Sequence, residues 1–152
     1  MSKIVQKFIR IFRKFLFWLW HQDGTSAERA RGLAFGVFSG CFPFFGFQIF
    51  LGISLAVLFR GNRVLAALGT WISNPITYLP LYLFNFNVGC FFLGNLPENT
   101  VVNQITFDVF WDNGLSFVLR ILLGSTIVGF LSALAIGFII YMLSKANLIN
   151  YS

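Results

Sequence analysis

The sequence is poor in charged residues and in the residues that most often carry catalytic or metal chemistry. Only 11% of its 152 residues are charged, against about 25% in soluble domains. It has one histidine and two cysteines, and Cys41 and Cys90 both lie within apolar segments. Such a set provides neither metal ligands nor a disulfide framework. The composition therefore indicates a membrane protein, and we expect no metal and no cofactor.

The sequence also lacks the usual motifs of enzymes. It has no Gly-x-Ser-x-Gly turn, no His-Glu-x-x-His zinc motif and no phosphate-binding loop. All five acidic residues lie in expected loops or at the ends of segments, so a carboxylate pair at membrane depth is missing as well. We predict that the protein is not an enzyme and has no catalytic residues, and that it does not couple protons through buried carboxylates.

Two long apolar runs make up the middle of the chain. They cover residues 32–59 and 64–97 and are separated only by Arg60-Gly61-Asn62-Arg63. Each run is too long for one plain span of about 20 residues and short for two spans with a turn. The residues expected to break the helices are Gly40, Pro43, Gly46 and Pro75. Because lipid tolerates non-helical backbone only where protein or a wet cavity surrounds it, we predict an all-α, polytopic integral membrane protein with broken or re-entrant helices.

Basic residues determine the expected topology. The net charge of +6 does not indicate nucleic acid, because the basic residues lie beside apolar runs; an anionic lipid leaflet is the expected partner. The positive-inside rule places the basic N-terminus in the cytoplasm, and Lys145 places the C-terminus there too. A re-entrant first run keeps Arg60 and Arg63 on that side. The second run can be a broken span or a second re-entrant segment, and charge alone does not decide between them.

These features divide the chain into two parts. Residues 1–24 are expected to form a basic amphipathic helix that lies on the membrane surface. Residues 25–152 are expected to form the integral membrane domain, whose first helix begins at a capping box of Thr25 and Glu28. The expected parts of this domain are a re-entrant hairpin over 32–59, a broken span over 64–96, an external loop over 97–117 and a last span over 118–144.

The last span has small residues at every fourth position, and these allow another helix to approach closely in lipid. The residues are Ser125, Gly129, Ala133 and Gly137. The partner can be another helix of the same chain or a second copy in a homo-oligomer. Arg120, near the start of this span, is expected to snorkel toward the membrane surface.

Each helix break should leave backbone N–H groups without partners at membrane depth. Polar side chains nearby can cap these helices themselves, or the helix starts can form a shared anion pocket. Arg60 and Arg63 can hold a phosphate or simply anchor the loop at the inner surface, while Asn62 is expected to cap the next helix. The candidate ligand-binding residues are Gln48, Arg60, Asn62, Arg63, Ser73, Asn74, Thr77 and Tyr78.

Three motifs in this order resemble a known family. They are Gly36-x-Phe38-x-Gly40-x-x-Pro43-x-x-Gly46-x-Gln48, Arg60-x-Asn62-Arg63 and Gly69-x-Trp71-x-x-Asn74-Pro75-x-Thr77. Over residues 25–94 the chain resembles the bacterial membrane family named domain of unknown function 2062. The resemblance implies a small inner-membrane protein, in some relatives joined to a glycosyltransferase-like domain that we do not expect in this chain. It implies no assigned activity.

Together these observations lead to one functional hypothesis and one alternative. The protein is expected to bind or translocate an anionic lipid or lipid-phosphate carrier, and the resemblance suggests a role in envelope glycoconjugate metabolism. The alternative is a non-transporting scaffold that anchors a partner enzyme, such as a glycosyltransferase-like protein. The expected location is the bacterial inner membrane, with several passes and both termini in the cytoplasm.

Overall fold

The computed structural model describes residues 22–44, 46–94 and 107–149, and all the regular elements in this part of the chain are helices. The all-α prediction is confirmed for these residues, whereas the predicted amphipathic helix over residues 1–24 lies almost wholly outside them. In chain order the elements are α2 (Ser26–Gly40), α3 (Phe47–Leu58), α4 (Arg63–Gly69), the 3₁₀ helix η1 (Thr70–Ile72), α5 (Tyr78–Leu93) and α6 (Phe107–Ile149).

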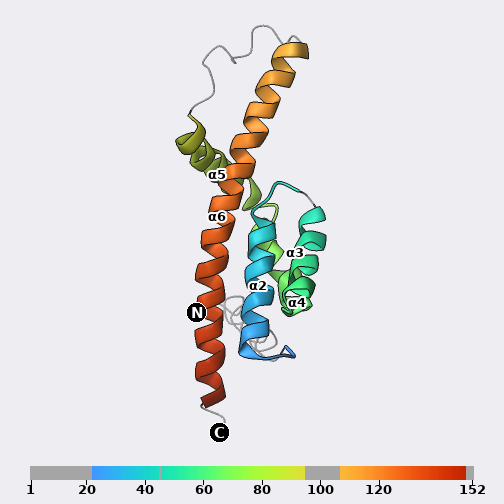
Figure 1. The fold of residues 1–152 in the computed structure, drawn as a ribbon, viewed down its shortest axis with the longest axis vertical. Coiled ribbons are helices and arrows are strands. Elements are labelled where there is room, and N and C mark those ends of the chain that lie inside the picture. Colours follow the sequence, from blue (N-terminus) through green and yellow to red (C-terminus); the bar gives the residue numbers. More distant parts are fainter. Residues whose placement is uncertain (1–21, 45, 95–106, 150–152) are drawn as a thin grey trace, which may run out of the picture.

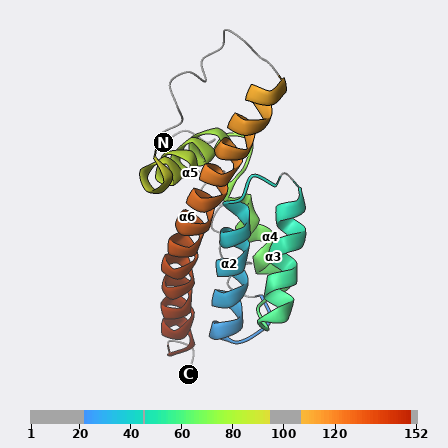
Figure 2. The same ribbon diagram turned by 45° about the horizontal axis from the view of Figure 1, so that its top comes forward.

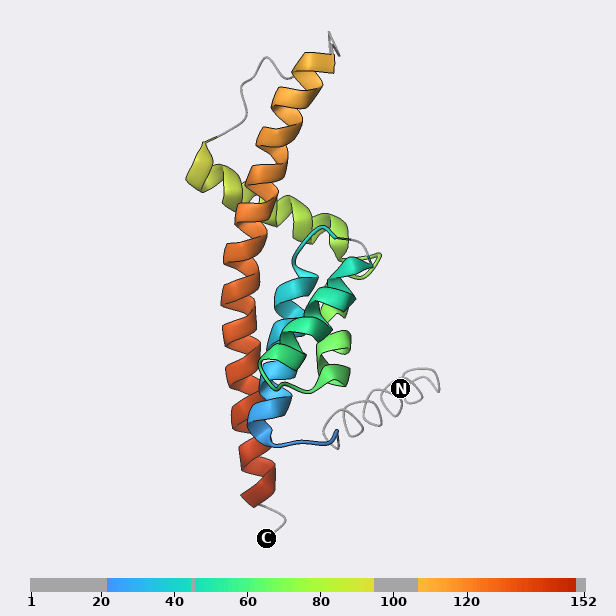
Figure 3. The same ribbon diagram turned by 45° about the vertical axis from the view of Figure 1, so that its right-hand side comes forward.

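Helix α2 is at the centre of the fold. It packs against α6 on one side and against α3 and α4 on the other; α3 and α6 run antiparallel to it and α4 runs parallel to it (Figure 1). Helix α5 packs against α6 and lies across it, near the end of the bundle where α2 finishes (Figure 2). The start of α2, the turn between α3 and α4 and the end of α6 all lie at the opposite end (Figures 1 and 3). The bundle therefore has two distinct ends.

Helix α2 begins and ends where the sequence indicates. The hydroxyl of Thr25 accepts a hydrogen bond from the Glu28 backbone N–H (3.2 Å), and the Thr25 N–H donates to the Glu28 carboxylate (2.6 Å). This is the predicted capping box. After Gly40 the chain turns, with Gly46 at a φ of 80°, and α3 returns alongside α2. The predicted interruption at Gly40, Pro43 and Gly46 is therefore the site of a helix reversal.

Glycines bring α2 and α4 into backbone contact. A Cβ atom added to Gly69 would lie 2.9 Å from the Gly36 Cα atom, and one added to Gly36 would overlap the Ala66 carbonyl oxygen. Small residues at helix contacts permit such an approach. One turn earlier, a Cβ atom on Gly61 would lie 2.8 Å from the Gly32 backbone nitrogen. The α3–α4 turn is thus held tightly against α2.

The second apolar run also breaks where expected. Helix α4 and η1 end at Ile72, residues 73–77 form a turn, and α5 starts in a new direction at Tyr78. Helix α4 with η1 has ten residues, which gives a length of roughly 15–17 Å, and the sixteen residues of α5 give about 24 Å. Each is shorter than the roughly 30 Å hydrocarbon core of a bilayer.

The small-residue stripe of α6 packs within the chain. A Cβ atom on Gly129 would lie 3.1 Å from the Phe38 carbonyl oxygen of α2, and one on Gly137 would lie 3.2 Å from the Ala34 Cβ atom. Ser125 is fully buried and accepts a hydrogen bond from α5. Of the two alternatives left open for this stripe, the structure has the packing against helices of the same chain.

Helix α6 is longer than expected. It begins at Phe107, so residues 107–117, which the sequence analysis placed in the external loop over 97–117, are helical. The external loop was expected because no basic residue lies within 98–117, and charge does not distinguish a loop from the start of a helix. Within the segment from Gly114 to Lys145, an 18-residue window has a mean hydropathy of 2.3, and only 6% of that window is buried.

Among the described residues, this is the one helix long and apolar enough to cross a membrane. A core helix of a soluble protein would be mostly buried, and this one is not. The helix therefore indicates an association with the membrane.

Candidate functional site

The candidate ligand-binding residues lie in two groups at opposite ends of α3 and α4. Arg60, Asn62 and Arg63 surround the α3–α4 turn, whereas the group at Gln48 and residues 73–78 lies at the other end. Helix α3 has twelve residues, which separates the groups by roughly 18 Å. A single phosphate cannot contact both. The candidate residues therefore do not form one shared phosphate site.

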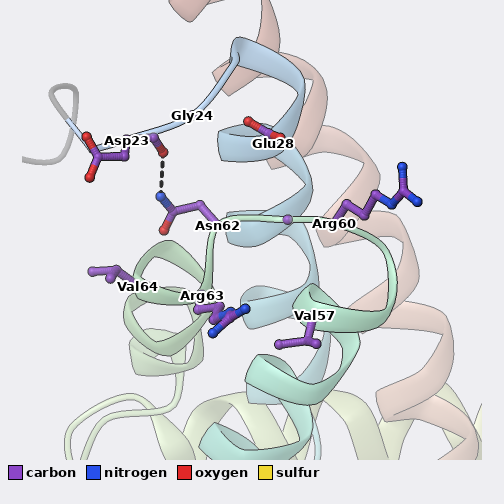
Figure 4. A pocket seen from close by; sticks show the side chains of 9 residues that line it. Asp23, Gly24, Glu28, Val57, Arg60, Asn62, Arg63 and Val64 are labelled. Carbon is purple, nitrogen blue, oxygen red and sulfur yellow. Dashed lines mark hydrogen bonds between the residues drawn. The ribbon is translucent and has the colours of Figure 1, made fainter.

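An open pocket of about 620 Å³ lies at the α3–α4 turn (Figure 4). Its lining residues are Asp23, Gly24, Glu28, Val57, Arg60, Gly61, Asn62, Arg63 and Val64. One wall is the segment that leads into α2, and the other is the end of α3 with the turn and the start of α4. The sequence predicted the arginine wall but missed the acidic one, because no local pattern shows that residues 23–28 pack beside residue 62.

Asn62 joins the two walls. Its side-chain oxygen accepts a hydrogen bond from the Leu65 N–H (2.9 Å), which is the predicted cap of α4. Its side-chain nitrogen donates to the Asp23 carbonyl oxygen (2.7 Å; Figure 4), and its backbone N–H donates to the Glu28 carbonyl oxygen (2.9 Å). With three hydrogen bonds in use, Asn62 acts as a structural link rather than as a free ligand contact.

Two arginines near the pocket stabilise its backbone. Arg29 donates from Nε and Nη2 to the Gly24 carbonyl oxygen (3.0 and 2.9 Å). Arg31 donates from Nη2 to the carbonyl oxygen of Arg60 (3.0 Å), a residue with a φ of 53°. Left-handed backbone is costly for a residue with a side chain, so this hydrogen bond helps to hold the turn. Both guanidinium groups thus have structural roles.

Arg60 and Arg63 differ from these two arginines. Both side chains are exposed, and within the described part of the chain neither forms a hydrogen bond or an ion pair through its guanidinium group. The two side chains do not point toward one another (Figure 4). The Thr25 backbone N–H and the Thr25 hydroxyl, together with the nearby Arg31 charge, hold the pKa of the Glu28 carboxyl below its ordinary value. The pocket therefore contains cations without protein partners and an ionised carboxylate.

The second group of candidate residues is satisfied internally. The Asn74 side-chain oxygen accepts hydrogen bonds from the N–H groups of Ile76 (2.9 Å) and Thr77 (3.1 Å). The Thr77 hydroxyl donates to the Ile72 carbonyl oxygen (2.6 Å), and the Ser73 hydroxyl donates to the Gln48 side-chain oxygen (3.1 Å). Of the alternatives for this break, the structure has self-capping around Asn74, with Pro75 in the turn and Tyr78 at the start of α5.

A buried polar contact that the sequence analysis missed lies close to this group. Asn85 is fully buried, and its side-chain nitrogen donates to the Cys41 carbonyl oxygen (2.9 Å) and to the Ser125 hydroxyl (3.0 Å). The Tyr82 hydroxyl donates to the Phe42 carbonyl oxygen (3.1 Å). These bonds satisfy carbonyl groups just after the end of α2 and join it to α5. An asparagine within an otherwise apolar helix was the available signal.

Arg120 has a structural role that the sequence analysis did not predict. Its Nε donates to the Gly94 carbonyl oxygen (2.8 Å), its Nη2 to that of Leu93 (3.4 Å) and its Nη1 to that of Ser116 (2.9 Å). That Arg120 snorkels toward the membrane surface stays a prediction. Its guanidinium group caps the carboxyl end of α5, where backbone carbonyls lack helical partners and a cation is favoured.

Comparisons with known proteins agree with the motifs. The model of one family, described as an uncharacterized protein conserved in bacteria, matches residues 9–150. A search of curated proteins and a search of solved structures found no match. The match covers both pocket walls and every described helix. The chain therefore belongs to the bacterial family named domain of unknown function 2062.

Proposed function

We propose that this protein is a multi-pass protein of the bacterial inner membrane that binds the phosphate of a membrane lipid at Arg60 and Arg63. The ligand is an anionic lipid or a lipid-phosphate carrier. Large apolar side chains exposed on the outer faces of α3, α5 and α6 support the membrane setting, since soluble proteins rarely expose so much contiguous apolar surface. They include Phe47, Phe50, Leu58, Leu79, Leu83, Phe91, Phe92, Leu131, Leu134 and Phe138.

The placement of basic residues supports a cytoplasmic pocket. The start of α2, the α3–α4 turn and the end of α6 lie at the same end of the bundle (Figure 1). This end carries Arg31, Arg60, Arg63 and Lys145, and an excess of basic residues marks the cytoplasmic side. Helices α2 and α3, with fifteen and twelve residues, would extend only about 22 and 18 Å. We infer that they form a re-entrant hairpin that opens toward the cytoplasm.

One observation carries the functional proposal: the pocket combines unpartnered guanidinium groups with exposed valines. Arg60 and Arg63 form no ion pair within the described residues, while Arg29 and Arg31 are used to hold the backbone. Guanidinium groups bind phosphate through paired hydrogen bonds. Val57 and Val64 line the same pocket and are 49% and 44% exposed. A lipid likewise carries a phosphate next to an apolar chain, so the phosphate would bind the guanidinium groups and the chain would contact the valines.

Native mass spectrometry of the purified protein tests the proposal. Wild type and the double variant Arg60→Gln, Arg63→Gln are titrated with phosphatidylglycerol, and bound lipid is counted. Loss of two charge-assisted contacts should weaken binding about tenfold or more. Lys145→Gln is the matched control, because it removes one charge at the same end of the bundle but outside the pocket. If the double variant binds lipid as wild type does, the assigned site is wrong.

The scaffold alternative has no separate support from the described residues. One of its motives was the small-residue stripe of α6, and that stripe packs against α2 of the same chain. The other was the basic segment over residues 1–24, which lies almost wholly outside the described part.

A further inference from the structure

The pocket has walls of opposite charge. Asp23 lies in the segment before α2 and Glu28 in the first turn of α2, whereas Arg60 lies in the α3–α4 turn and Arg63 begins α4 (Figure 4). The two acidic and two basic side chains give the pocket lining no net formal charge. A ligand that lies across the pocket therefore meets carboxylates on one side and guanidinium groups on the other.

The opposite charges are held apart. Within the described residues, no ion pair joins Asp23 or Glu28 to Arg60 or Arg63. The backbone explains the separation, because Asn62 fixes the turn to the Asp23 and Glu28 carbonyl oxygens and Gly61 packs on Gly32. One Glu28 oxygen is used by the Thr25 N–H, whereas the Asp23 carboxylate is exposed and has no partner in this part of the chain.

We propose that the pocket recognises a headgroup that carries both a phosphate and a protonated amine, with phosphoethanolamine as its simplest form. The inference rests on the proposed phosphate site at Arg60 and Arg63, and it replaces the anionic lipid with a zwitterionic one. The phosphate lies at Arg60 and Arg63, and the ammonium lies toward Asp23 and Glu28. Specificity is a difference between affinities. A neutral glycerol headgroup leaves the carboxylate wall without a cation, and a diphosphate brings additional negative charge close to it.

A competition between two lipids tests this inference. Phosphatidylethanolamine and phosphatidylglycerol with identical acyl chains are mixed in equal amounts with the purified full chain, and the bound ratio is measured by native mass spectrometry. Wild type should favour phosphatidylethanolamine. In the double variant Asp23→Asn, Glu28→Gln this preference should fall about threefold or more, the size expected for partly exposed charge pairs. Glutamine at position 28 can still complete the capping box, so the start of α2 is retained.

Further measurements separate the possible sources of the ligand. Free phosphoethanolamine and free glycerol phosphate are added as competitors of the bound phosphatidylethanolamine. Displacement by the first but not the second supports recognition of the headgroup alone. If neither displaces the lipid while the lipid preference persists, the headgroup is recognised in the intact lipid, which also supports the inference. Equal displacement by both compounds contradicts it.

The outcomes also distinguish this inference from the function on which it rests. Equal binding of the two lipids by wild type, or an unchanged ratio in Asp23→Asn, Glu28→Gln, overturns the inference. The proposed function survives that result if Arg60→Gln, Arg63→Gln weakens binding of both lipids. If the arginine variant binds both lipids as wild type does, the proposed function and the inference fail together. Lys145→Gln should leave both the amount bound and the ratio unchanged.

Discussion

The two ends of the α3–α4 hairpin deal with broken helices in different ways. At the end near α5, short neutral side chains satisfy the backbone, and Asn74 and Thr77 cap their own turn. At the cytoplasmic end that we propose, Asn62 and Arg31 hold the backbone, while Arg60 and Arg63 remain without partners among the described residues. A break in a helix is therefore a weak indicator of a binding site. A charged side chain that forms no hydrogen bond or ion pair within the fold is a stronger indicator of a binding site.

The largest expected effect on stability comes from disturbing the close contact between α2 and α4, which lies between the two ends of the hairpin. Gly36→Ala places a methyl group against the Ala66 carbonyl oxygen and 2.8 Å from the Gly69 Cα atom, so it should lower the free energy of unfolding by about 2–3 kcal/mol. Thermal unfolding in detergent measures the change. Gly114→Ala is the matched control, since nothing lies within 4 Å of its added Cβ atom, and it should be neutral or slightly stabilising. Equal effects of the two changes would contradict the close α2–α4 contact.

A somewhat smaller effect is expected at the end near α5. Asn85→Ala removes the hydrogen bonds to the Cys41 carbonyl oxygen and the Ser125 hydroxyl, both within the buried contact, and should cost about 2 kcal/mol. Asn87→Ala, at an exposed position of the same helix, should cost little. Lipid binding by the folded Asn85→Ala protein should equal that of wild type. Weaker lipid binding would show that the two ends are coupled, contrary to the comparison.

The smallest expected effect concerns the acidic wall and depends on pH. Because the fold lowers the pKa of Glu28 from its ordinary value, the stability that this carboxylate contributes is present above its unfolded pKa and is lost as the pH falls through its folded pKa. Glu28→Gln should therefore lower the melting temperature slightly at neutral pH, and the difference from wild type should shrink in acid. A difference that grows in acid would contradict the capping arrangement.

Local signals in the sequence predicted much of the fold. The capping box at Thr25, the cap at Asn62 and the helix breaks near Pro43 and Pro75 depend on residues within one or two turns of each other, so they can be recognised without knowing the packing. The small residues around Gly129 indicated close packing but not the partner. Their contact with α2 depends on how distant helices align.

The parts that were missed depend on contacts between distant segments. The acidic wall of the pocket exists because Asp23 and Glu28 pack beside Asn62, and no spacing in the sequence reports this. Arg120 caps a helix that ends 27 residues earlier, so no local pattern in the sequence indicates this role. Helix α6 starts at Phe107, earlier than the sequence predicts, because acidic residues are compatible with a loop and with the start of a helix.

The contact between Gly61 and Gly32 has a consequence for how a ligand would be admitted. Both sides of the pocket are attached to helix α2. The segment before α2 continues into this helix, and the α3–α4 turn packs directly against it. The opening cannot widen or shut without parting packed helices. We therefore expect a pocket of constant width that selects ligands by their size and by the positions of their charges. Binding and release should then require no opening or closing of the pocket.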